Sequence, residues 1–263
     1  MDYIMVTGAY GGMGKAVVQA LKQAGYFVFA LDKNVENTEE NVMPIRADLT
    51  DIDSLNAAFE QVRSITNNLS AILHFAGIYM LDSLIEIDEE KFRRAFEINV
   101  FGVYQINKIF LPLLHKGSRI IITTSELAPL HPLPFTGLYA ITKSTLDKYA
   151  YSLRMEVQLL GISVSVLRPG AVRTDMLNVS TTALDKFCEN TKLYSCNAKR
   201  FKNIVEGVEA RHVPPEKVAK KAVKILKTKH PKYVYKLNRN PLLLLLHILP
   251  PRLQTWIIKQ VLK

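Results

Sequence analysis

The stretch Tyr3-Ile4-Met5-Val6-Thr7-Gly8-Ala9-Tyr10-Gly11-Gly12-Met13-Gly14 decides the fold. Its first four residues are apolar and predict a short strand, and residues 15–24 have helical character. Glycines allow a tight turn and let a ligand approach the backbone, while the N-terminus of the following helix favours a phosphate. A glycine-rich turn between a strand and a helix therefore predicts a dinucleotide site.

Composition limits the class of protein. The chain has 263 residues, of which 48% are hydrophobic, enough for one large α/β domain. Two cysteines provide no disulfide framework and the N-terminus shows no signal peptide pattern, so we expect a cytoplasmic protein. The net charge is +10, but zinc-ligand spacing and RNA-binding aromatic motifs are missing, so we expect no nucleic acid partner and no metal.

Apolar strand patterns alternate with helical patterns from residue 3 to about 170, which predicts a doubly wound parallel sheet. Ligands of such sheets bind beyond the carboxyl ends of the strands. After the first strand, the expected strands are 26–31, 43–47, 70–75, 118–124, 162–167 and 232–236. The expected helices are 15–24, 51–65, 88–114, a helix carrying Tyr139 that continues to about 160, and 216–227.

Asp32 ends the second predicted strand, 18 residues after Gly14. A dinucleotide fold presents an acid near this place to the hydroxyls of the adenosine ribose. A carboxylate would repel a 2′-phosphate, so Asp32 favours NAD over NADP, although the cation of Lys33 could tolerate the phosphate. The alternative is that Asp32 is only a turn residue.

Tyr139 and Lys143 are four residues apart, which places them on one face of a helix, one turn apart. A phenol is a weak acid, with a pKa of about 10, and a neighbouring ammonium favours the phenolate. Such a tyrosine can give a proton to a carbonyl oxygen or take one from an alcohol. An ordinary amphipathic helix would show the same spacing, so the spacing indicates a catalytic pair only in combination with motifs elsewhere in the chain.

Together these motifs resemble the short-chain dehydrogenase/reductase family, in its single-domain branch. The resemblance runs from Tyr3 to about residue 175 and rests on spaced elements in the family's order. These are TGAYGGMG at 7–14, Asp48, Asn99, Ser125, YAITK at 139–143 and RPGAVRT at 168–174. It implies a Rossmann-type sheet of seven mostly parallel strands flanked by helices, and reversible hydride transfer between a nicotinamide and an alcohol or ketone carbon.

The resemblance also implies roles for individual residues. Tyr139 is the general acid/base, Lys143 lowers its pKa and holds the nicotinamide ribose, and Ser125 binds the substrate oxygen. Asn99 anchors a water that links Lys143 to solvent. The remaining cofactor-binding positions are the adenine contact Asp48, the carboxamide contacts Thr174 and Val172, and Gly8, Tyr10, Gly11, Gly12, Met13, Gly14, Asp32, Leu49, Ala76, Gly77, Pro169 and Gly170.

Two departures from the family's pattern need attention. Phe75 stands where the family has an asparagine, which puts the local strand bonding in doubt. The catalytic serine commonly lies 13 residues before the tyrosine, whereas Ser125 lies 14 before Tyr139. We interpret this as a longer loop and keep Ser125, with Thr124 as the alternative.

The pattern loosens between Thr174 and Pro214, where the family has its substrate lid, here expected at about 175–213. Apolar residues here and near the catalytic helix could line a pocket for a bulky lipophilic alcohol such as a steroid, bile acid or retinoid. They could equally pack onto the sheet. The candidates are Met176, Leu177, Val179, Leu184, Phe187, Leu193 and Tyr194, with Leu130, Leu133 and Phe135.

Residues 241–263 form a tail beyond the expected domain at 1–240. The tail is apolar and then basic and amphipathic, which suits peripheral contact with a membrane surface, a subunit contact or a flap over the active site. Its longest apolar run is too short to span a bilayer.

The leading hypothesis is an NAD(P)-dependent short-chain alcohol dehydrogenase or carbonyl reductase that prefers NAD and acts on a small molecule, a bulky hydrophobic alcohol or ketone. A catalytically inactive NAD-binding sensor or scaffold is the alternative, and a sugar-nucleotide epimerase of the same superfamily ranks lower because its glycine pattern differs. The family often forms homodimers or homotetramers.

Overall fold

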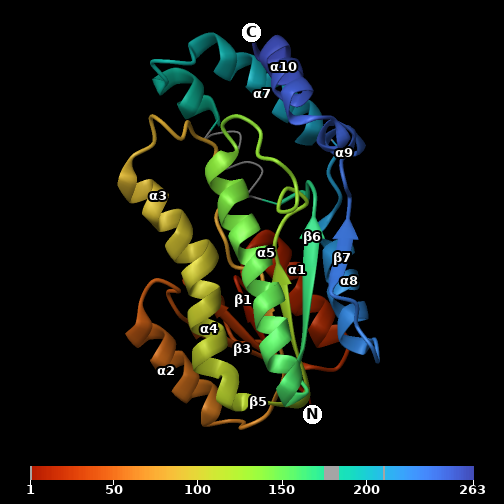
Figure 1. Ribbon diagram of the computed structural model, residues 1–263. Helices are drawn as coiled ribbons and strands as arrows, with labels where there is room; N and C mark the ends of the chain where they lie inside the picture. Colours follow the sequence, from red (N-terminus) through yellow and green to blue (C-terminus); the bar gives the residue numbers. More distant parts are fainter. Residues whose placement is uncertain (1, 175–183, 210) are drawn as a thin grey trace.

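The computed structural model describes residues 2–174, 184–209 and 211–263. Its strands form one sheet in the order β3-β2-β1-β4-β5-β6-β7, and every neighbouring pair is parallel (Figure 1). The seven-stranded Rossmann-type sheet predicted from the sequence is thereby confirmed. The strands are β1 Tyr3–Thr7, β2 Phe27–Asp32, β3 Val42–Arg46, β4 Leu69–His74, β5 Leu114–Thr123, β6 Ser163–Pro169 and β7 Val234–Leu237.

Helices cover both faces of the sheet. Helices α1 and α8 lie together on one face, and α2, α4 and α5 cover the other (Figure 1). The helices are α1 Gly12–Gln23, α2 Ile52–Arg63, α3 Glu89–Phe96, α4 Gly102–Phe110, α5 Gly137–Val157, α7 Ser195–Glu209, α8 Pro215–Lys227, α9 Pro241–Ile248 and α10 Pro251–Leu262.

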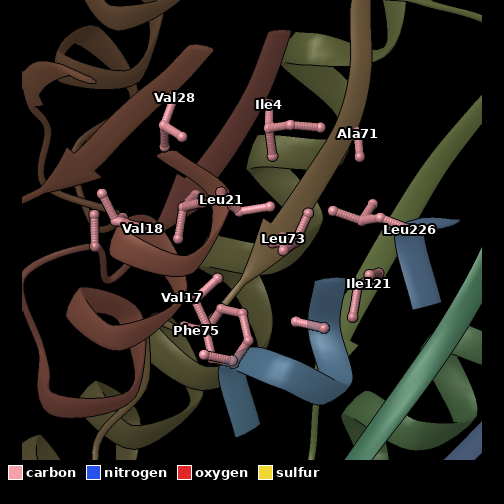
Figure 2. Close-up of a cluster of buried hydrophobic side chains, with 14 of the residues drawn as sticks. Ile4, Val17, Val18, Leu21, Val28, Ala71, Leu73, Phe75, Ile121 and Leu226 are labelled. Carbon is pink, nitrogen blue, oxygen red and sulfur yellow. The ribbon is translucent and has the colours of Figure 1, made fainter. Parts of the chain in front are cut away.

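A buried apolar cluster joins α1 and α8 to the sheet. Val17 and Leu21 of α1 and Leu226 of α8 meet the strand residues Leu73 and Ile121 (Figure 2). These side chains have almost no exposed surface, so their burial contributes a large part of the free energy that stabilises the fold.

Some predicted boundaries were wrong. The seventh strand begins at Val234 instead of residue 232, and β5 begins at Leu114, four residues before the prediction. The long helix expected at 88–114 is divided by a π-helical turn at Glu97–Phe101 and ends in a 3-10 turn at Leu111–Leu113. Pro112 explains the second change, because proline has no backbone N–H for an α-helical hydrogen bond.

The tail folds into α9 and α10, which lie with α7 at the end of the sheet to which the strands point (Figure 1). Side-chain hydrogen bonds hold it there. The amide of Asn197 donates to the carbonyl of Leu262 at 2.6 Å, and Gln254 is within 3.1 Å of His131. Within the described ranges, no helix combines the length and the apolar character needed to cross a membrane. The proposed boundary at 240 stays a prediction.

Candidate active site

The glycine loop is built by close backbone contacts. A Cβ at Gly8 would lie 2.4 Å from the backbone nitrogen of Ala76, and Gly8 also has a φ of +67°. A Cβ at Gly14 would lie 1.9 Å from the carbonyl oxygen of Gly8. At Gly11, by contrast, the nearest atom to an added Cβ would be 3.5 Å away, which is an ordinary van der Waals contact. The loop therefore presents bare backbone beside the N-terminus of α1, which fits a pyrophosphate.

A cleft of about 1940 Å³ extends from this loop across the ends of β2, β3 and β4. Its size and its glycine cradle fit a dinucleotide. Most predicted cofactor residues line it: Gly8, Tyr10, Gly11, Gly12, Met13, Gly14, Asp32, Asp48, Leu49, Ala76, Gly77 and Thr174. The others, Pro169, Gly170 and Val172, line a neighbouring chamber that shares Met13, Gly77 and Thr174 with the cleft.

Charged groups near the end of β2 are arranged in two sets. The carboxylate of Asp32 accepts the backbone N–H of Tyr10 at 3.0 Å, which fixes it beside the glycine loop. The ammonium of Lys33 lies 2.8 Å from the carboxylate of Asp48. That hydrogen bond, together with those from Thr50, lowers the pKa of Asp48 to about 2. The contact of Asp48 with adenine stays a prediction.

Ser125 and Tyr139 form the centre of the second chamber. Ser125 is buried, Tyr139 is partly buried, and both line the chamber. Burial raises the pKa of Tyr139 to about 12, and the hydrogen bond with Ser125 opposes this increase. The role of Lys143 in lowering the tyrosine pKa stays a prediction.

Lys143 is also buried, one turn further along α5, as the spacing predicted. Its ammonium lies 5.7 Å from the centre of the Tyr139 ring and donates to the carbonyl of Thr123 at 3.2 Å. Burial lowers the pKa of Lys143 to about 8. The lysine thus remains largely charged near neutral pH and faces the cleft beside Gly77.

Asn99 connects three parts of the site. Its amide oxygen accepts the backbone N–H of Ile78 at 2.8 Å, and its amide nitrogen donates to the carbonyl of Ile78 and the hydroxyl of Thr142. The side chain therefore ties the loop after β4 to α5 and lies next to Gly77. The water that the family resemblance assigns to Asn99 stays a prediction.

The alternatives raised by the two sequence departures are clarified by geometry. The hydroxyl of Thr124 donates to the carboxylate of Asp147 at 3.3 Å, whereas Ser125 lies against Tyr139, which favours Ser125 as the substrate-binding serine.

The backbone N–H of Phe75 donates to the carbonyl of Thr7 at 3.0 Å, so the strand bond forms without an asparagine. The ring of Phe75 packs on the apolar cluster beside Val17 (Figure 2).

The chamber has about 1220 Å³ of space, partly open to solvent, and mostly apolar walls. Of the predicted wall residues, Leu133 lines it. Four others lie instead in a separate buried apolar cluster or pack against that cluster: Phe135, Leu184, Phe187 and Tyr194. Leu130 is buried beside the tail, Leu193 is exposed, and the predicted wall residues at 176, 177 and 179 lie outside the described residues.

Glu126 and Leu243 are among the lining residues that the sequence did not predict. Glu126 follows Ser125 in sequence and is nearly fully buried in the chamber wall. Burial raises the pKa of its carboxyl. Leu243 reaches the chamber from α9 in the tail. Its place in a run of leucines gave no signal that this leucine, among its neighbours, would face the site.

Comparison with known proteins agrees with this arrangement. Residues 2–185 match the family described as short chain dehydrogenase. The chain belongs to the short-chain dehydrogenase family. It is therefore an oxidoreductase of a family that uses nicotinamide cofactors, and the family resemblance inferred from the motifs is confirmed.

Individual short-chain dehydrogenases and related oxidoreductases show how far the likeness extends. The uncharacterized oxidoreductase YbbO of Escherichia coli strain K12 is 34% identical over 194 residues, which cover 71% of this chain and 72% of YbbO. The 3-ketodihydrosphingosine reductase of Bacteroides thetaiotaomicron is 27% identical over 234 residues, which cover 88% of this chain and 85% of the reductase. A short-chain dehydrogenase from Streptomyces avermitilis has the same fold, with a TM-score of 0.78 at 20% identity. The superposition covers 99% of this chain and 96% of that structure.

Proposed function

We propose that this short-chain dehydrogenase uses NAD to interconvert an alcohol and a ketone on a bulky hydrophobic substrate of the steroid, bile acid or retinoid kind. The observation that carries the proposal is the hydrogen-bonded pair of hydroxyls, Ser125 and Tyr139, in a largely apolar chamber next to the glycine-lined cleft. This pair can hold and protonate one oxygen atom of a substrate whose remaining surface is apolar.

The chemistry divides between the cofactor and the protein. When bound, the nicotinamide accepts the hydride from the alcohol carbon or donates it to the ketone carbon. Tyr139 gives its phenolic proton to the ketone oxygen during reduction and accepts the alcohol proton during oxidation. Ser125 holds that oxygen by a hydrogen bond. The Lys143 cation favours the phenolate that exists after proton donation, and the apolar walls exclude water.

The preference for NAD rests on Asp32. Its carboxylate lies at the end of β2 and lines the cleft, where a 2′-phosphate would meet a negative charge. The ion pair between Lys33 and Asp48 supports this reading, because it partly neutralises the nearby cation that could otherwise attract the phosphate. Both members of that pair are partly exposed, so the pairing weakens the attraction without abolishing it.

The size and polarity of the chamber support a lipophilic substrate. Leu127 and Leu133 of the loop between β5 and α5, Phe201 of α7 and Leu243 of α9 line it, so three separate segments contribute. The relative from Bacteroides is named as a reductase of 3-ketodihydrosphingosine, which is consistent with reaction at a ketone. The mostly apolar walls of the chamber suit a ring system or a long chain, and its volume of about 1220 Å³ includes the part open to solvent.

The test is hydride transfer followed by absorbance, with NAD or NADP and a panel of steroids, bile acids, retinol and short alcohols. We expect turnover of a bulky apolar alcohol with NAD. Tyr139→Phe should lose most of it, while Tyr151→Phe, an exposed tyrosine on the same helix, should keep it. Turnover of short polar alcohols alone would refute the lipophilic substrate. NAD binding without turnover across the panel would favour the sensor alternative.

A homodimer or homotetramer is the proposed assembly. Helices α4 and α5 lie side by side at the front of Figure 1. Tyr104 of α4, Tyr151 and Met155 of α5, and Phe101 just before α4 are exposed. Pairing of two copies through these helices would bury the aromatic rings. Light scattering should give at least twice the chain mass, and Tyr151→Glu should reduce it.

A further inference from the structure

The outer face of the tail is apolar, and its orientation is fixed. Leu243 of α9 points into the substrate chamber, while Leu262 of α10 and Gln254 are buried against the lid and the loop before α5. Because these inner contacts hold both helices, the opposite sides of the helices face solvent.

The exposed side carries large apolar residues in helical register. In α9, Leu242, Leu245 and Ile248 are 63%, 61% and 79% exposed and recur every three residues, which places them along one stripe. In α10, Trp256 is 59% exposed. We call these four residues the tail stripe. A group of exposed large apolar residues on a protein surface commonly marks an interaction site.

The charge around the tail stripe has one sign. Residues 239–263 contain Arg239, Arg252, Lys259 and Lys263 and neither Asp nor Glu. The last three are exposed. Across the described ranges, no carboxylate lies within ion-pair distance of any of the four. Apolar side chains together with Trp, Lys and Arg suit the interface of an anionic bilayer.

We propose that the tail stripe docks on an anionic lipid surface. A symmetric contact between two copies through this face would bring these cations toward each other, whereas anionic headgroups would neutralise them. The tail helices lie at the same end of the molecule as the substrate chamber (Figure 1). Docking would therefore place the chamber next to the lipid. This last consequence rests on the proposed function, since an apolar substrate dissolves in that layer.

The experiment uses the full chain and its single tryptophan, Trp256. Vesicles of phosphatidylcholine, with or without one quarter phosphatidylglycerol, are added while the emission spectrum is recorded and binding is measured by flotation. We expect a blue shift and binding with the anionic vesicles. Leu245→Asp should lower the affinity at least tenfold. Ile65→Asp, at an exposed position at the end of α2, should bind like the unchanged chain.

The charge is tested separately. Lys259→Gln should lower the affinity for anionic vesicles about fivefold, because one cation near the surface contributes on the order of 1 kcal/mol. Lys227→Gln, at the end of α8 away from the tail, is its matched control. Equal binding of Leu245→Asp and the unchanged chain, or no blue shift with any vesicle, would overturn the proposal.

Two further measurements separate the alternatives. Tyr139→Phe should bind vesicles normally, so loss of turnover and loss of docking are distinguishable. If Leu245→Asp converts an oligomer to a smaller species in sedimentation experiments and the chain ignores vesicles, the tail stripe is a subunit contact and the lipid proposal is wrong.

Discussion

The carboxylate of Glu126 accepts the backbone N–H of Asn240 at 2.7 Å. Glu126 follows Ser125 in sequence. Asn240 is the residue before α9, and its side chain accepts the N–H of Leu242. One partly buried hydrogen bond thus connects the segment after β5 to the tail.

Breaking this bond should loosen the tail. In Glu126→Met, an apolar side chain of similar length cannot accept the N–H, whereas Glu126→Gln keeps an acceptor oxygen. We expect Glu126→Met to be cleaved by trypsin after Arg239 or Arg252 several times faster than the unchanged chain. A charged hydrogen bond of this kind contributes about 1.5–3 kcal/mol. Equal cleavage rates of the Met and Gln variants would show that other contacts hold the tail.

The buried phenol of Tyr139 should titrate late in the chain without cofactor. Burial raises its pKa to about 12, so the phenol should stay protonated up to pH 10. The carbon resonances of labelled tyrosine report this, and Tyr139→Phe identifies which of the 11 tyrosines is observed. Exposed Tyr151 serves as the internal comparison. Titration of Tyr139 below pH 9 would mean that the Lys143 cation outweighs burial.

Gly11 offers a way to separate cofactor binding from folding. Its backbone is extended with a φ of −72°, and an added Cβ would make an ordinary van der Waals contact at 3.5 Å, so Gly11→Ala should fold with nearly unchanged stability. The same methyl group would stand where a pyrophosphate approaches the loop. We expect NAD affinity to fall at least tenfold in calorimetric titration. Gly207→Ala in α7 is the control. An unchanged NAD affinity of Gly11→Ala would refute the proposal that the glycine loop binds the pyrophosphate.

His74 should make the fold sensitive to acid. Its ring is buried, and this burial lowers its pKa from 6.5 to about 4, partly offset by a hydrogen bond with Asn107. The folded state therefore binds fewer protons than the unfolded state. The stabilisation is complete above pH 6.5 and is lost as the pH falls toward 4.

The size of this effect can be measured by urea unfolding. The free energy of unfolding of the unchanged chain should drop by roughly 3 kcal/mol more than that of His74→Gln between pH 7 and pH 4. His230→Gln, at an exposed site, should follow the unchanged chain. Parallel pH curves for all three chains would show that His74 does not titrate in this range.

Local patterns explain what could be predicted from the sequence. The glycine turn needs only neighbouring residues, and the spacing of Tyr139 and Lys143 needs only a helix, so the sheet and the centre of the candidate site follow directly. Contacts between distant segments do not follow from local patterns. Leu243 lies about 100 residues after Tyr139, and it lines the chamber only because of the way α9 packs on the rest of the molecule. In the sequence, Phe135 and Phe187 look like pocket residues. In the structure, their rings pack against each other in a buried apolar cluster away from the chamber wall.

The expected acidity of Tyr139 shows the same limit in electrostatic terms. Spacing identifies Lys143 as a neighbour, but the extent of burial is a property of the whole packed structure. Here burial acts on both groups, raising the pKa of one and lowering that of the other. Sequence reasoning identifies the pair, whereas the depth at which the two groups are buried comes only from the structure.

The position of Leu243 has a consequence for how such an enzyme can diversify. The groups proposed to hold and protonate the substrate oxygen belong to α5 and to the residues just after β5, whereas Leu243 belongs to a segment that adds no strand to the sheet. Substitutions in α9 can therefore reshape the space offered to a substrate while the reacting groups keep their geometry. Specificity and chemistry are thus encoded in separate stretches of the chain, and selection can alter the first without disturbing the second.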